Sequence, residues 1–175
     1  MSLTSYIRTI PDYPQKGVQF RDITTLLHNP DGLKLAIDQL VDHYHDIPID
    51  RIAVIESRGF LLGAPLAYHL NKGLVLIRKK GKLPAATISE NYDMEYGTNT
   101  IEVHTDAISP GERILLIDDL IATGGTAEAA VRLIRKCGGK VVECAFLIDL
   151  PELGGARRLN DAGCPTFALC AFDGE

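Results

Sequence analysis

The sequence lacks any long apolar run, and none of its hydrophobic stretches approaches the roughly 20 residues that cross a bilayer. Its N-terminal segment also lacks an apolar stretch followed by a small-residue cleavage site, which argues against a signal peptide. We therefore expect a cytoplasmic protein that does not enter a membrane.

Cysteine is scarce, with four in 175 residues. Cys137, Cys144, Cys164 and Cys170 are too scattered to form paired metal ligands or a compact disulfide framework. A chain of this length buries roughly two-thirds of its unfolded surface, so its core requires neither a bound metal nor disulfide bonds for stability. We interpret the four residues as buried, reduced thiols in a single domain covering residues 1–175.

Positive charge is also in short supply, because 18 Lys and Arg stand against 23 Asp and Glu and leave a net charge of −5. Broad nucleic-acid binding depends on neutralising phosphates, so we expect no nucleic-acid partner. The 46% hydrophobic and 23% charged fractions are typical of a globular protein. A small polyanion can still bind where cations cluster locally.

Apolar strands alternate with amphipathic helices along the chain. Asn29 and Pro30 are typical of a helix start, and the apolar spacing after them predicts a helix to about Tyr44. Further helices are expected at about 60–70, 126–137 and 153–162. Strands are expected at 51–56, 74–78, 100–104, 113–119, 141–150 and 166–172. Several of these strands are continuous apolar runs, which indicate a parallel sheet covered on both faces.

We therefore predict an α/β fold with an open, mostly parallel twisted sheet and helices on both faces. In that architecture ligands bind beyond the carboxyl ends of the strands. One such end carries the strongest chemical signal, the segment 114–126 (ILLIDDLIATGGT). Its loop and helix start can bind a phosphate, its two glycines allow positive φ, and Asp118 and Asp119 can accept hydrogen bonds from ribose hydroxyls.

This segment resembles the motif with which type I phosphoribosyltransferases bind phosphoribosyl pyrophosphate (PRPP). Five other segments are similar to the members of that family that use adenine, in the same order, over roughly residues 5–150. They are 11–14 (PDYP), 17–23 (GVQFRDI), 56–60 (ESRGF), 75–84 (VLIRKKGKLP) and 94–97 (MEYG). Gln19 and Glu56 stand where relatives often have Val and Asp. The resemblance implies a pentosyltransferase of purine salvage that converts adenine and PRPP to AMP and pyrophosphate.

The resemblance also assigns the base and sugar sites. A small N-terminal hood, about residues 1–30, is implied to select adenine, with Phe20 on one face of the purine and Leu120 on the other. Main-chain groups of Gln19 and Arg21 are implied to contact the 6-amino edge. Asp118 and Asp119 are implied to be catalytic at the ribose. The 5′-phosphate is assigned to Ala122, Thr123, Gly124, Gly125 and Thr126.

Pyrophosphate binding is implied for Ser57, Arg58, Arg78, Lys79 and Lys82, with Arg58 catalytic. Arg78 is implied to reach the site of a neighbouring subunit, which makes the protein a homodimer. We interpret Lys80, in the same basic run, as solvated charge.

Residues 79–98 show no regular pattern and have the length of a lid or binding loop. We expect a flexible catalytic lid there. The resemblance implies that Glu95 handles proton transfer at the purine and that Tyr96 helps to seal the site. Mg²⁺ is expected to be carried mainly by PRPP, so no protein metal ligands are assigned.

Three alternatives remain open. The chain can be a phosphoribosyltransferase for hypoxanthine, guanine or xanthine, although the hood and segment 94–97 favour adenine. It can be a non-catalytic regulator that senses PRPP, but such proteins usually carry an added DNA-binding domain. It can be a scaffold without a ligand, which leaves six matching segments unexplained.

Overall fold

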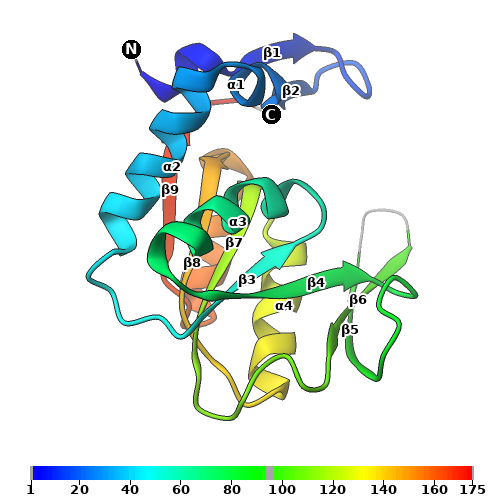
Figure 1. Ribbon diagram of the computed structural model, residues 1–175. Coiled ribbons are helices and arrows are strands. Elements are labelled where there is room, and N and C mark those ends of the chain that lie inside the picture. The colour runs from blue at the N-terminus through cyan, green and yellow to red at the C-terminus, as the bar shows by residue number, and fades with distance from the viewer. Residues whose placement is uncertain (1, 94–96, 175) are drawn as a thin grey trace.

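The computed structural model describes residues 2–93 and 97–174 of the chain. In this part a seven-stranded sheet has the order β5-β6-β4-β3-β7-β8-β9, and β1 and β2 form a separate hairpin (Figure 1). The strands are β1 Arg8–Pro11, β2 Gln19–Asp22, β3 Arg51–Ile55, β4 Gly73–Lys79, β5 Thr87–Asp93, β6 Thr98–His104, β7 Arg113–Ile121, β8 Lys140–Asp149 and β9 Thr166–Ala171. The helices are α1 Thr24–His28, α2 Pro30–Tyr44, α3 Arg58–Leu70, α4 Gly125–Lys136 and α5 Gly155–Asp161, with short 3-10 helices η1 Leu3–Tyr6 and η2 Pro151–Leu153.

The predicted parallel sheet is confirmed for β4, β3, β7, β8 and β9, which pair in parallel. β3 shows why its sequence is continuously apolar. Its Ile52 and Val54 pack into a core under α2 and α3, whereas Ala53 and Ile55 pack into a second core under α4 and α5. Both faces of the strand are therefore covered, as the helices on either side of the sheet show (Figure 1).

The expectation of a lid without regular structure over residues 79–98 is wrong for Thr87–Asp93. These residues form β5, which pairs antiparallel with β6, and β6 pairs antiparallel with β4. The strand escaped detection because it is mostly polar and only its alternate residues are partly covered. Its Glu90 accepts a hydrogen bond from Arg132 of α4 at 3.0 Å, which ties the hairpin to that helix.

The start of α2 matches its prediction. The Asn29 side chain accepts hydrogen bonds from the amides of Asp31 (2.9 Å) and Gly32 (3.1 Å), and Pro30 is the first helical residue. This cap satisfies two of the amides that a helix leaves free at its N-terminus.

All four cysteines are free. Cys144 and Cys164 are buried, but Cys137 and Cys170 are only half-buried, so full burial was a wrong expectation for two of them. Within the described residues, no helix combines the length and apolar character needed to cross a membrane.

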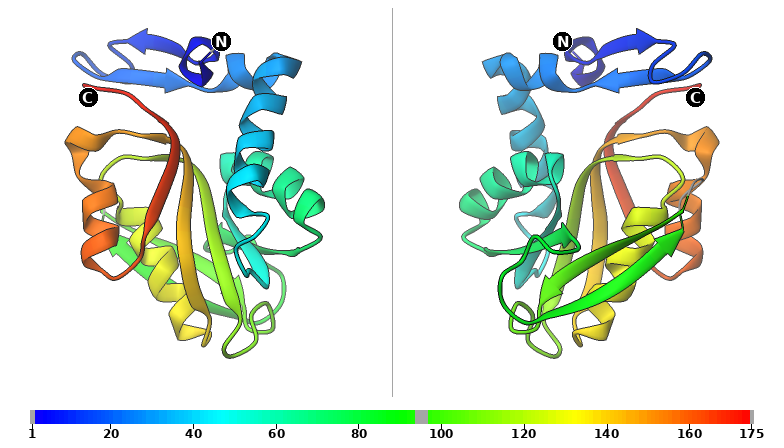
Figure 2. Two further views of the ribbon diagram at one scale, coloured as in Figure 1. Left: turned by 90° about the vertical axis from the view of Figure 1, so that its left-hand side faces the viewer. Right: turned by 90° about the vertical axis from the view of Figure 1, so that its right-hand side faces the viewer.

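The hood lies as a separate layer over one end of the sheet. It contains η1, the β1–β2 hairpin and α1, and both side views place it beyond the carboxyl ends of the parallel strands (Figure 2). Phe20 and Gln19 on β2 pair with Ile10 and Pro11 on β1. The end of the sheet where ligands are expected therefore faces a second structural layer.

Candidate active site

A cavity of about 810 Å³ lies between the hood and the end of β7. It collects the residues assigned from sequence to the base, the ribose and the 5′-phosphate. They are Gln19, Phe20, Arg21, Leu120, Asp118, Asp119, Ala122, Thr123, Gly124, Gly125 and Thr126. Residues separated by about a hundred positions thus form one site, and its volume is in the range of small-molecule pockets.

Sequence reasoning missed several residues that line this cavity. Gln15 and Val18 belong to the turn between β1 and β2, and Leu150 and Leu153 follow β8. Val18 lay inside a matching segment, and Gln15 lay between two of them, so position alone could have suggested these two. Leu150 and Leu153 carried no chemical signal, because apolar residues after a strand are ordinary core candidates.

The phosphate loop, residues 122–125, joins β7 to α4. Gly124 has φ +82°, and an added Cβ would lie 3.0 Å from the backbone of Gly155. Of the two glycines that allow positive φ, Gly124 uses it and Gly125 does not. An added Cβ at Gly125, the first residue of α4, would lie 3.8 Å or more from its neighbours, so it would make only ordinary van der Waals contacts. The free amides at this helix start are suited to an anion.

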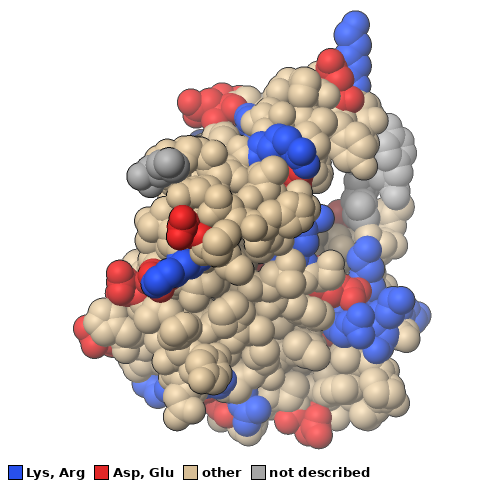
Figure 3. Space-filling view, turned by 45° about the horizontal axis from the view of Figure 1, so that its top comes forward, with Lys and Arg blue, Asp and Glu red and all other residues tan. Residues whose placement is uncertain are grey.

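A second cavity of about 470 Å³ adjoins the first. It brings together Ser57, Arg58, Lys79 and Lys82, four of the five residues assigned to pyrophosphate. Tyr92 of β5 also lines it and was not anticipated from the sequence. Basic side chains gather beside a hollow on this face of the molecule (Figure 3). The second cavity is therefore suited to a polyanion.

The two cavities share a wall formed by Arg58, Asp118, Asp119 and Thr126. Arg58, the first residue of α3, forms an ion pair with Asp119 near the end of β7. The hydrogen bond to Asp119 raises the pKa of Arg58. Burial, and then the charge of Asp119, raise the pKa of Asp118 well above its usual value.

Gly59 allows α3 to begin this close to β7. A Cβ at Gly59 would lie 2.9 Å from the carbonyl oxygen of Ile117 and 3.1 Å from Oδ1 of Asp118. A side chain there would push the start of α3 away from the strand end. Close packing of α3 against β7 thus explains the glycine in segment 56–60. The same close packing allows Arg58 to reach Asp119.

Glu56 organises the basic run after β4. Its Oε2 accepts a hydrogen bond from Nε of Arg78 at 3.0 Å, and its Oε1 accepts one from the amide of Lys79 at 2.7 Å. Burial opposes the charge of Glu56, but these bonds lower its pKa overall. Arg78 is absent from the lining of the second cavity, although its Nη1 donates to the carbonyl oxygen of Lys82 at 3.4 Å.

The base end of the first cavity is lined by Phe20 and Arg21. The ring of Tyr13 packs edge-on against Phe20, with centroids 5.2 Å apart. The Arg21 guanidinium donates to Oγ1 of Thr9 at 2.6 Å and to the carbonyl of Asp173 at 2.9 Å. Its charged end is thus bound to other protein groups, which agrees with a main-chain role at the base.

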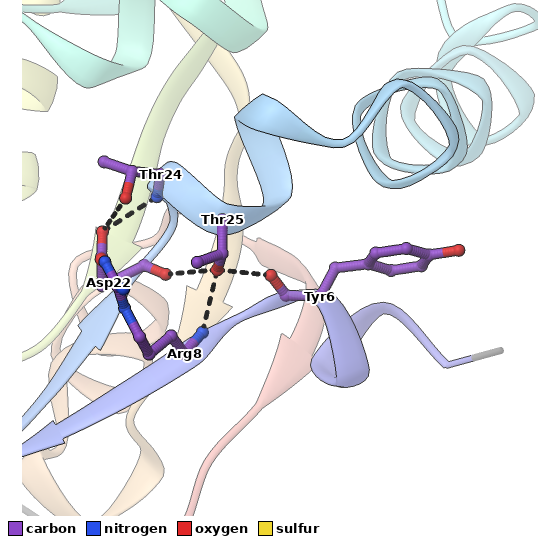
Figure 4. Close-up of polar contacts among 5 residues, drawn as sticks. All are labelled: Tyr6, Arg8, Asp22, Thr24 and Thr25. Atoms are coloured by element: carbon purple, nitrogen blue, oxygen red, sulfur yellow. Dashed lines mark hydrogen bonds and ion pairs between the residues drawn. The ribbon is translucent and has the colours of Figure 1, made fainter.

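A polar network within the hood fixes the β1–β2 hairpin to the start of α1 (Figure 4). Oδ1 of Asp22 accepts hydrogen bonds from the amide and hydroxyl of Thr24, at 2.9 and 2.7 Å, and Oδ2 accepts one from Nε of Arg8 at 3.1 Å. Arg8, together with these bonds, lowers the pKa of Asp22 to about 2. The Thr25 hydroxyl donates to the carbonyl of Tyr6 at 2.7 Å and accepts from the amide of Arg8 at 3.2 Å.

Two assigned residues, Glu95 and Tyr96, lie outside the described residues. The described strand β5 ends at Asp93, whose carbonyl oxygen would lie 3.9 Å from a Cβ on Gly125. In residues 2–93 and 97–174, no group of three or more His, Cys, Asp or Glu side chains could hold a metal ion.

Comparison with known proteins matches residues 22–169 to the phosphoribosyl transferase domain family. The chain is 58% identical to the adenine phosphoribosyltransferase of Nitrosospira multiformis over 175 residues, which is 100% of both chains. The solved adenine phosphoribosyltransferase of Rhodothermus marinus is 52% identical, with a TM-score of 0.90 over 97% of this chain and 96% of that one. The Saccharomyces cerevisiae enzyme, solved with adenine and an imino-altritol bisphosphate, is 36% identical, with a TM-score of 0.88 over 95% and 96% of the two chains.

Proposed function

The chain belongs to the adenine phosphoribosyltransferases of the phosphoribosyltransferase family, and we propose that it joins adenine to PRPP and releases AMP and pyrophosphate. The observation that carries this proposal is the pair of adjoining cavities with a common wall at Arg58, Asp118 and Asp119. The reaction breaks a bond between a sugar and a pyrophosphate, so it requires sites for a nucleotide and a diphosphate that meet at the sugar. The product serves purine salvage in the cytoplasm.

Adenine binds in the first cavity, under the hood. Phe20 stacks on one face of the purine and Leu120 covers the other, because they line the cavity from the hood and from β7. Main-chain groups of Gln19 and Arg21 contact the 6-amino edge. A site that hydrogen-bonds this edge rejects a base with an oxygen there, because buried polar groups would be left unpaired.

The sugar and its 5′-phosphate bind at the end of β7. The phosphate accepts hydrogen bonds from the phosphate loop, where Gly125 leaves room for its approach. Thr123 and Thr126 line the same cavity and add hydroxyl donors. Asp118 and Asp119 accept hydrogen bonds from the ribose hydroxyls, which places the anomeric carbon at the shared wall.

The paired carboxylates also suit the transition state. Departure of pyrophosphate leaves positive charge on the ribose, as in glycoside hydrolysis. Asp118 and Asp119 repel one another in the resting protein, and this repulsion contributes to the raised pKa of Asp118. A positive charge beside them relieves the repulsion, so they stabilise the transition state more than the ground state.

Pyrophosphate leaves into the second cavity. Arg58, Lys79 and Lys82 supply fixed positive charge where negative charge develops, and Ser57 supplies a polar contact. Glu56 holds the Lys79 amide and the Arg78 side chain in place, so the basic run is organised before substrate binds.

Proton transfer at the purine is assigned to Glu95, and Tyr96 seals the site against water that would hydrolyse PRPP. Mg²⁺, when bound with PRPP, neutralises part of the diphosphate charge. The shared wall offers only some of the oxygen ligands that such an ion needs. Asp118 and Asp119 offer carboxylate oxygens, which Mg²⁺ prefers, but substrate and water must supply the remaining ligands.

A homodimer fits an apolar surface beside Arg78. Leu61 and Tyr68 are two turns apart on α3 and are 48% and 85% exposed, and Leu74 and Leu76 are exposed on β4. Grouped apolar residues on a surface are typical of a protein interface. A twofold interface here would place Arg78, at the end of β4, against the partner subunit.

The test is a product assay of the purified protein with PRPP, Mg²⁺ and, in parallel, adenine, hypoxanthine, guanine or xanthine. We expect AMP from adenine alone. The Arg58→Ala variant is the control, because it keeps the hood residues assigned to the base but removes a cation from the shared wall. Turnover with a different base would overturn the assignment of the hood. No turnover with any base would support a PRPP-sensing regulator.

A further inference from the structure

The hood is too small to hold its own position. Its hairpin has two strands of four residues each, Arg8–Pro11 and Gln19–Asp22, and an isolated two-stranded hairpin is marginally stable at best in water. Contacts outside the hairpin must therefore hold β2 over the base cavity. The Asp22 network supplies one such contact, at the end of β2 that leads into α1 (Figure 4).

The C-terminal segment supplies another contact, from the core. The chain continues past β9, and the amide of Phe172 donates to the carbonyl of Asp149 at 3.1 Å. The Phe172 side chain packs against the core under α2 and α3. Both side views show this segment rising from β9 to the hood (Figure 2). Phe172 is thus fixed to the sheet at the point where the chain reaches the hairpin.

On the hood side, Arg21 contacts this C-terminal segment. Its guanidinium carbon lies 4.6 Å from the centre of the Phe172 ring, and it donates to the Asp173 carbonyl at 2.9 Å. It also donates to Thr9, its partner across the hairpin. Within the described residues no carboxylate forms an ion pair with Arg21. The Phe172 ring and the oxygens of Asp173 and Thr9 therefore stabilise the positive charge of Arg21.

We propose that Phe172 and Asp173 act as a latch that sets the height of the hood above the core and thereby the affinity for the base. Arg21 follows Phe20 on β2, so displacement of Arg21 displaces the residue assigned to stack on adenine. Leu120, on the opposite wall, belongs to β7 and stays with the core. Phe172 does not line the cavity; it is a positioning residue. The expected change in KM for adenine rests on the proposed function.

The decisive variant is Phe172→Leu, which keeps an apolar side chain but removes the aromatic face. We expect KM for adenine to rise about 3- to 30-fold, the range of a lost cation–π contact. KM for PRPP and kcat should not change, because the phosphate loop and the shared wall belong to the core. Phe172→Tyr keeps the ring and should restore the wild-type KM.

Phe167→Leu is the matched control. Phe167 lies on β9, packs against the same core and stacks on His43 at 3.7 Å, away from the hood contacts of Arg21. The same substitution there should leave KM for adenine unchanged. An equal rise in both Leu variants, or no rise in Phe172→Leu while the wild type converts adenine, would overturn the latch.

Hydrogen exchange of the free protein tests the latch without catalysis. Phe172→Leu should speed amide exchange at residues 19–21 but not at 118–126, and Phe167→Leu should do neither. Unchanged exchange at residues 19–21 would refute the latch even if the enzyme is active. Faster exchange in a protein that does not use adenine would retain the latch and reject the proposed function.

Discussion

Arg58 and Asp119 form an ion pair at the wall between the two cavities, so one guanidinium borders both the proposed sugar site and the proposed pyrophosphate site. Asp119 is only 7% exposed, and Arg58 supplies its compensating charge. A guanidinium has five N–H donors and can bind a phosphate while it keeps its carboxylate partner. In the proposed mechanism the pair links departure of pyrophosphate to the carboxylate assigned to the ribose.

The neighbouring carboxylates should respond oppositely to amide substitution. The pKa of Asp118 is raised in the folded state, so its contribution to stability is present below its ordinary value of 3.8 and is lost as pH rises through the raised value. Ionisation of Asp118 therefore costs folding stability, and Asp118→Asn should raise Tm at pH 7. The gain should vanish below about pH 4.

Asp119→Asn should instead lower Tm at neutral pH, because it breaks the ion pair with Arg58. Both variants should lose activity, since both remove a ribose contact. Thermal unfolding of the two variants from pH 3 to pH 8 checks the signs. Destabilisation by Asp118→Asn at pH 7 would show that Asp118 is stabilising when charged.

Adjacent glycines of the phosphate loop should fail in different ways. A Cβ at Gly125 makes no close contact, so Gly125→Val should unfold near the wild-type temperature, but it should abolish PRPP binding by blocking the proposed phosphate site. Gly124→Ala adds a Cβ at φ +82° and 3.0 Å from Gly155, which should cost about 1–3 kcal/mol of stability. Calorimetric titration of PRPP and thermal unfolding separate the two outcomes. Wild-type PRPP affinity in Gly125→Val would mean that the phosphate binds elsewhere.

Glu95→Gln keeps the size of the side chain and removes its ability to exchange a proton. We expect kcat to fall about 10²- to 10⁴-fold, the usual value of general acid–base assistance. Single-turnover measurements at saturating adenine and PRPP report the chemical step. Glu152→Gln, at an exposed position in η2, is the control. Turnover near that of the wild type would remove Glu95 from the mechanism.

A mixing experiment tests whether Arg78 acts across a dimer. Arg78→Ala and Glu95→Gln are each expected to be nearly inactive alone. In a mixed dimer, the subunit carrying Arg78→Ala keeps its own Glu95 and receives Arg78 from its partner, so one of the two sites is intact. If half of the dimers are mixed, activity should recover to about a quarter of the wild-type value.

If mixed dimers form but activity does not recover, Arg78 acts in the active site of its own subunit. Leu76→Asp supplies the matching test of the interface. It puts a charge on the exposed apolar face of β4 and should give monomers in sedimentation velocity. Lys140→Glu, on an exposed position of β8, should leave the dimer unchanged.

The central strands could be predicted because each is buried on both faces and is therefore apolar along its whole length. The turn from β7 into α4 could be predicted because its residues are contiguous, so 114–126 carries a complete local pattern of strand, glycine loop and helix start. β5 could not be recognised, since an edge strand of polar residues resembles a loop in sequence. Its identity depends on pairing with β6 and on the contact of Glu90 with Arg132.

Contacts between segments far apart in the sequence could not be predicted either. Arg21 and Asp173 are 152 positions apart, and neither has a spacing or composition that points to the other. The Asp22 network shows the same limit at shorter range, because its bonds depend on how η1 and β1 pack against α1. Local sequence patterns therefore predict which residues line the cavities better than they predict the contacts that hold those residues in place.

The close approach of Gly124 and Gly155 extends the constraint on the loop 122–125 to α5, a helix that lines neither cavity. A Cβ at Gly155 would lie 2.4 Å from the carbonyl of Ala122, so any side chain at the start of α5 would displace the loop assigned to the 5′-phosphate. In a saturation-mutagenesis survey scored on growth, Gly155 should be as intolerant as Gly125, although only Gly125 lines the cavity. Mutational sensitivity in this protein will therefore outline the ligand together with the protein layer directly behind it.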